Sequence, residues 1–149
     1  IVMTDVTGFG TLVSIVASTT FPVGFPVMSF ADDTDPIDIP SLQIGEGVMG
    51  VNGDLITYKK ANPIPVTIAL IPNTLDQEAM NVLLLANRPS KGKKYVNDNI
   101  TMVVTFPNFK VVTLSTGKII EGVPGASIAS AGRVKTFTYK FIFKDIAGI

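Results

Sequence analysis

The strongest constraint on the fold is an alternation near the end of the chain, Phe137-Thr-Tyr-Lys-Phe-Ile-Phe143. Aromatic residues occupy every second position of this stretch. Successive side chains of a β-strand point to opposite faces, so a strand here places four aromatic rings on one face. The pattern predicts a strand at the core of a β-sandwich or small barrel.

The same period of two recurs along most of the chain. Further strands are predicted over about 10–17, 25–31, 37–44, 54–60, 64–71, 100–106 and 109–121. The sequence has no internal repeat and no composition break that would divide it. We therefore expect one mainly β domain over residues 1–149.

One helix is predicted over about 74–87. Thr74-Leu-Asp-Gln77 has the pattern of a capping box, in which Thr74 accepts from the Gln77 amide and Gln77 reaches back. Pro89 then ends the helix. The expected core face is an apolar stripe of Leu75, Ala79, Val82, Leu83 and Ala86.

The chain is too apolar and too weakly charged for an ordinary monomer surface. Charged residues make up 16% and the mean hydropathy is +0.42, against roughly 25% charged residues in a typical soluble domain. A membrane helix needs roughly 18 apolar residues, and the longest apolar run is only Val82-Leu-Leu-Leu-Ala86. We expect no membrane span and favour obligate self-assembly.

The absence of certain residue types from the sequence argues against several functions. The chain has no Cys and no His, the commonest metal ligands, and His is also the commonest general base. No Ser lies in a G-x-S-x-G motif. Because the net charge is +0, the chain as a whole has no electrostatic field that would attract nucleic acid. We expect no catalytic residue, no metal site, no cofactor and no enzyme activity, although a pair of carboxylates could in principle act together.

Gly45, Gly47 and Gly50 have the spacing G-x-G-x-x-G of a dinucleotide-binding loop. Such a loop requires a helix to begin at the last glycine and an acidic residue about 20 positions later. Here a turn signal, Val51-Asn-Gly-Asp54, and a strand pattern follow. The stretch instead predicts a β-hairpin whose Asn52-Gly53 turn allows positive φ at both residues.

Three loops are expected. Residues 31–38 are acidic and contain Asp32, Asp33, Asp35 and Asp38, but lack the glycine and final Glu of a calcium loop. They form a solvated loop or offer negative charge to a partner. Residues 88–99 form a flexible basic tip, a phosphate grip or an arm over a neighbouring subunit. Residues 122–132 are rich in small residues and are expected to be mobile.

The order of these patterns resembles a known family. A glycine-rich hairpin, Val48-Met-Gly-Val-Asn-Gly-Asp-Leu-Ile56, precedes the segment Lys60-Ala-Asn-Pro-Ile-Pro-Val-Thr-Ile-Ala-Leu-Ile-Pro-Asn-Thr74, a capped helix and long closing strands. From about residue 10 to 146 the chain resembles tail tube proteins of phages with contractile tails. It is more distantly similar to tube proteins of type VI secretion and pyocin-like systems.

This resemblance implies hexameric rings that stack into a hollow tube, with inner strands joined into one barrel around the channel. It also implies genomic DNA and a tape-measure protein inside, a sheath outside, assembly in the host cytoplasm and a place in the virion. The expected subunit-interface residues are Met49, Asn52, Gly53, Lys91, Lys93, Lys94 and Tyr95. Alternatives are a tube of an injection or secretion system, and a monomeric β module that binds sugar or nucleic acid.

Overall fold

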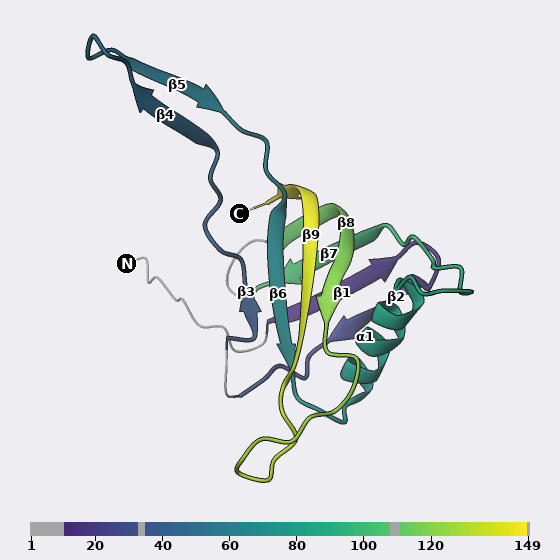
Figure 1. Ribbon diagram of the computed structural model, residues 1–149. Coiled ribbons are helices and arrows are strands. Elements are labelled where there is room, and N and C mark those ends of the chain that lie inside the picture. Colours follow the sequence, from purple (N-terminus) through teal and green to yellow (C-terminus); the bar gives the residue numbers. More distant parts are fainter. Residues whose placement is uncertain (1–10, 33–34, 108–110, 149) are drawn as a thin grey trace, which may run out of the picture.

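The computed structural model describes residues 11–32, 35–107 and 111–148, and it is mainly β with one helix (Figure 1). The elements in chain order are β1 Leu12–Ala17, β2 Phe21–Val27, β3 Ile37–Asp38, β4 Gly45–Met49, β5 Leu55–Lys59, β6 Ile64–Leu70, α1 Leu75–Ala86, β7 Ile100–Thr105, β8 Val111–Gly122 and β9 Phe137–Ala147. Asp33, residue 10 and residues 109–110 of the expected elements lie outside the described residues.

Seven strands form one antiparallel sheet in the order β2-β1-β7-β8-β9-β6-β3. Figure 1 shows that this sheet curls into a half-barrel, with the two long strands β8 and β9 near its middle. The predicted small-barrel architecture is confirmed. In the described part of the chain, no helix is long and apolar enough to cross a membrane.

The core brings together buried side chains from the half-barrel sheet and from α1. Tyr139, Phe141 and Phe143 are fully buried, and Phe137 nearly so, which confirms the predicted aromatic face of β9. Side chains from β1, β6 and β7 make up most of the rest of this cluster, and β2, β8 and α1 also contribute. The buried members of these three strands are Val13, Ile15, Ala17, Ile64, Val66, Ile68, Leu70, Ile100, Met102 and Val104.

The predicted start of α1 is confirmed. The Thr74 side chain accepts a hydrogen bond from the Gln77 amide at 3.3 Å, so one of the unpaired donors at the helix start is satisfied. The return half of the capping box was predicted wrongly. The side chain of Gln77 is instead buried, and its Nε2 donates to the Tyr139 hydroxyl at 3.4 Å.

The predicted core face of α1 is partly right, because Leu83 is buried as expected and Ala79 and Ala86 are half-buried. Met80 and Leu83 are fully buried, whereas Leu75 is 83% and Val82 53% exposed. The helix is apolar on two faces, so periodicity alone does not identify which face meets the sheet. Contact with β2 and β8 turns Met80 and Leu83 inward and leaves an apolar stripe outside.

Two predicted strands have different bounds. The strand expected at 25–31 is β2, which begins earlier, at Phe21. The strand expected at 37–44 is reduced to the two residues of β3. Pro40 has no N–H group to continue the ladder, so the chain leaves the sheet shortly after β3.

Candidate assembly surface

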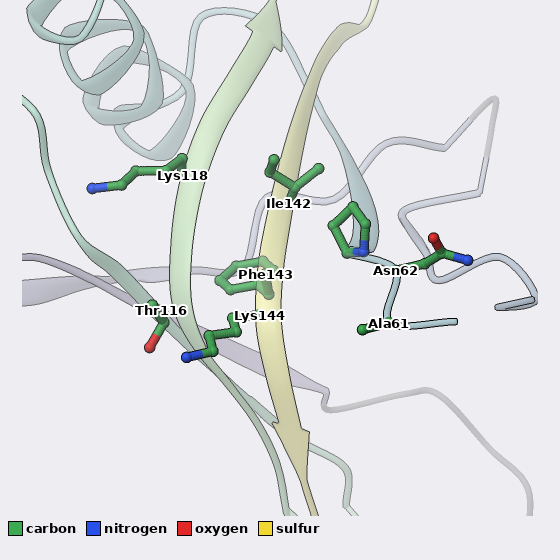
Figure 2. A pocket seen from close by; sticks show the side chains of 8 residues that line it. Ala61, Asn62, Thr116, Lys118, Ile142, Phe143 and Lys144 are labelled. Atoms are coloured by element: carbon green, nitrogen blue, oxygen red, sulfur yellow. The ribbon is translucent and has the colours of Figure 1, made fainter. Parts of the chain in front are cut away.

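One open pocket of about 310 Å³ lies where β8 and β9 meet the segment before β6. Figure 2 shows Lys118 and Lys144 among the side chains around it. Among the described residues that line the pocket there is no carboxylate to act with these lysines. Within residues 11–32, 35–107 and 111–148, no group of three or more carboxylates is placed to hold a metal ion.

A more distinctive feature is the hairpin arm, which we define as residues 44–60. Its strands β4 and β5 pair only with each other within the described chain, from Gly45 opposite Lys59 to Met49 opposite Leu55. Figure 1 shows the arm projecting away from the half-barrel. An isolated two-stranded hairpin is marginally stable in water, so the arm needs cover from elsewhere.

The G-x-G-x-x-G stretch forms β4 and the turn of the arm. The Gly53 amide donates to the Gly50 carbonyl at 2.9 Å, and the Gly50 amide to the Asp54 carbonyl at 2.7 Å. Gly53 has a φ of 83°, whereas Asn52 is not in the left-handed region, which corrects the expectation for Asn52. A turn and the strand β5 follow Gly50 directly, and not a helix, as the hairpin prediction required.

The arm exposes large apolar side chains on both faces. Register places Val48 and Ile56 on one face and Met49 and Leu55 on the other. With Ile44, Val51 and Tyr58, these residues are between 49% and 106% exposed. Because contiguous exposed apolar surface is rare on monomers, the arm is a candidate site of contact with another chain.

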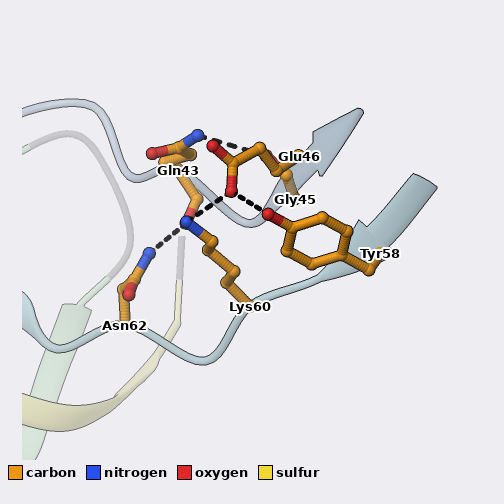
Figure 3. A network of polar contacts seen from close by, with 6 residues as sticks. All are labelled: Gln43, Gly45, Glu46, Tyr58, Lys60 and Asn62. Carbon is orange, nitrogen blue, oxygen red and sulfur yellow. Dashed lines mark hydrogen bonds and ion pairs between the residues drawn. The ribbon is translucent and has the colours of Figure 1, made fainter. Parts of the chain in front are cut away.

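A polar network fixes the root of the arm (Figure 3). The Glu46 carboxylate accepts from Lys60 Nζ at 2.6 Å and from the Tyr58 hydroxyl. Lys60 foremost, and then Tyr58, lowers the pKa of Glu46, while Glu46 raises the pKa of Tyr58. Asn62 also donates to the Gln43 carbonyl at 2.7 Å. Exposed pairs contribute little free energy, so the network serves mainly to direct the arm.

A second exposed feature is the basic turn, which we define as residues 88–95. The Lys93 amide donates to the Ser90 carbonyl at 3.1 Å, and Gly92 has a φ of 76°. Lys93 Nζ donates to the Leu85 and Arg88 carbonyls, where its charge also complements the helix C-terminus. The charged group of Lys93 is therefore already engaged within its own chain.

Buried Asp98 holds the basic turn against the β1–β2 turn. One carboxylate oxygen accepts from the Thr19 and Thr20 amides at 2.8 and 3.0 Å. The other accepts from the Thr20 hydroxyl and from Asn87 Nδ2, at 2.5 and 2.8 Å. Burial raises the pKa of Asp98, but these hydrogen bonds outweigh it and the net pKa is lowered.

The expected interface residues fall into two separate groups. Met49, Asn52 and Gly53 lie at the far end of the arm, while Lys91, Lys93, Lys94 and Tyr95 lie on the basic turn. Figure 1 shows the arm and the segment after α1 on different sides of the half-barrel. Apart from Met49, sequence reasoning missed the apolar members of the arm, which lie in adjacent pairs at Val48-Met49 and Leu55-Ile56.

Chains in three solved structures share this fold. An extracellular contractile injection system, the PVC sheath/tube terminator in its extended state, matches with a TM-score of 0.58 and 10% identity over 99% of this chain and 98% of that one. The anti-feeding prophage baseplate matches with 0.57 and 12%, over 99% and 97%. The tube-terminating cap of the anti-feeding prophage matches with 0.57 and 10%, over 99% and 92%.

The family itself is shown by sequence. The family model described as tail fiber protein gp32 matches residues 4–147, and the chain belongs to this family. No curated protein sequence gives a significant match. The chain is thus a β-rich member of a tail-protein family, with a fold found in assembled contractile injection systems.

Proposed function

We propose that this chain is the major tail tube subunit of a phage with a contractile tail. The whole chain acts as one domain, six copies form a ring, and rings stack into a hollow tube. The observation that carries this proposal is the apolar hairpin arm. Membership of a tail-protein family and the tube-type fold support it.

Cover for the arm is best supplied by another copy of the same chain. Burying a side chain such as Leu55 or Ile56 contributes about 1.5–3 kcal/mol when burial is complete, and the arm exposes several of them. We place the arm of one copy on a different surface of the next copy, which makes the contact heterologous. Repetition of such a contact builds an open-ended filament.

The remaining partners follow from this role. A sheath surrounds the tube, a tape-measure protein fills its channel during assembly, and genomic DNA later passes through it into the host cell. The particle is assembled in the host cytoplasm and the subunit remains in the virion. The function is passive, so we expect no catalysis and no cofactor. We also expect loops 88–99 and 122–132 to lose motion on assembly.

Two related functions have specific support. The names of the structural neighbours favour a tube of an injection system, which would carry protein instead of DNA. The family description favours a tail fibre. All three functions require self-assembly. A fibre would be solid, with no channel. An injection tube would be encoded and purified as part of a particle that has no genome-filled head. A monomeric binding module would remain a 15.8 kDa species.

The arm can be tested by placing charge on one of its faces. We expect Val48→Asp combined with Ile56→Asp to abolish assembly, measured by light scattering over a concentration series. Both side chains are more than half exposed, so the thermal unfolding of the subunit should change little. Assembly of the double variant at wild-type concentrations would remove the arm from the interface.

A further inference from the structure

Charge is sorted between two opposite edges of the sheet. The basic turn lies beside the end of the β2 edge strand, because Asp98, just after it, binds the β1–β2 turn. At the opposite edge of the sheet, two acidic side chains are exposed: Asp38 in β3, and Asp35 just before Pro36. Figure 1 shows the segment after α1 and β3 on opposite sides of the molecule. We call Asp35 and Asp38 the acidic edge.

We propose that the basic turn of one copy binds the acidic edge of the next copy around the ring. This inference rests on the proposed tube function and deepens it by naming the lateral contact. Lys91 and Lys94 are exposed and have no ion-pair partner within the described chain. The same holds for Asp35 and Asp38, whereas Asp32 already pairs with Arg133 at 2.8 Å.

The β2 edge is built to resist addition of another strand. Pro22 and Pro26 have no N–H groups to donate to a neighbouring strand. Gly24 has a φ of 87°, and a side chain there would come within 2.9 Å of Val16 Cγ2. Such an irregular edge with two prolines disfavours strand pairing between copies. We therefore assign the lateral contact to side chains near this edge strand, those of the basic turn, and not to strand pairing.

Both patches also offer apolar surface. Tyr95 beside the lysines is 52% exposed, and Ile39 beside Asp38 is 41% exposed. An interface commonly combines an apolar centre with a charged rim. Opposite charges would steer the copies together and fix their register, while Tyr95 and Ile39 would be removed from water. The patches differ, so the contact is heterologous and can close into a ring.

Charge reversal tests this contact directly. One variant carries Lys91→Glu and Lys94→Glu, and a second carries Asp35→Lys and Asp38→Lys. Each variant alone would face like charges at every lateral contact, so the concentration needed for assembly should rise at least about tenfold. An equimolar mixture should assemble near the wild-type concentration, because alternating copies in an even-numbered ring again place opposite charges together.

The control carries Lys135→Glu and Lys144→Glu, which gives the same change in net charge as the first variant but outside both patches, at exposed lysines without an ion pair in the described chain. It should assemble like the wild type. Wild-type assembly of either reversed variant, or failure of two folded variants to assemble when mixed, would overturn the lateral contact. If the wild type itself forms no tube, the proposed function fails; if it forms tubes but the reversals have no effect, only this inference fails.

Discussion

At the residue scale, the most consequential side chain that sequence reasoning missed is Asp98. Its partners Thr19 and Thr20 lie 79 and 78 positions away, so no local spacing signals the contact. The neighbouring residues looked like one polar loop. Charged residues within such a loop differ in role only through long-range contacts, and those emerge only when β1 pairs with β7.

Replacement of Asp98 should destabilise the subunit. In Asp98→Ala, two backbone amides, the Thr20 hydroxyl and Asn87 lose a buried charged acceptor. We expect the free energy of unfolding to fall by about 2–3 kcal/mol, as for loss of hydrogen bonds to a charged group. Asn97→Ala, an exposed neighbour, should change it by less than about 0.5 kcal/mol. Equal effects in chemical denaturation would refute the anchoring role.

The same residue predicts a pH dependence. The folded-state pKa of Asp98 is lowered from its ordinary value of 3.8, so its contribution is present above that value. It is lost as the pH falls below 3.8 through the lowered pKa. Unfolding free energy measured from pH 6 to pH 2 should therefore decline more steeply in the wild type than in Asp98→Asn. Parallel curves would contradict the lowered pKa.

At the scale of elements, alternation and capping predicted most boundaries because they are local properties of the chain. The bounds of β1, β5, β6, β7 and α1 are close to the expected ones. The choice between two apolar faces of α1 is not local. It depends on which face meets β2 and β8, and there the sequence pattern correctly included Leu83 but missed Met80 and wrongly included Leu75 and Val82.

The corrected helix face can be checked with two substitutions. Leu83→Ala removes a fully buried side chain and should lower the free energy of unfolding by about 2–5 kcal/mol. Val82→Ala acts on a side chain that is 53% exposed and should change it by less than about 0.5 kcal/mol. If Val82→Ala were the more damaging change in thermal or chemical unfolding, the assigned face would be wrong.

At the scale of the whole molecule, low charge and high hydropathy indicated self-assembly before any surface was known. Much of this excess lies in the hairpin arm and on the outer face of α1, where Val51 and Leu75 are 106% and 83% exposed, although Val23 in β2 is also 95% exposed. The overall composition does not say where in the fold each apolar residue lies, so it could not distinguish these exposed surfaces from the core. The G-x-G-x-x-G hairpin was found through its turn residues, but its separation from the main sheet required the full topology.

Electron microscopy of the purified full chain over a concentration series tests the central claim most directly. The account predicts hollow tubes of constant width, built from stacked rings of six subunits, with the arm buried between copies. A strictly monomeric 15.8 kDa species at high concentration, or a solid fibre with no channel, would contradict it.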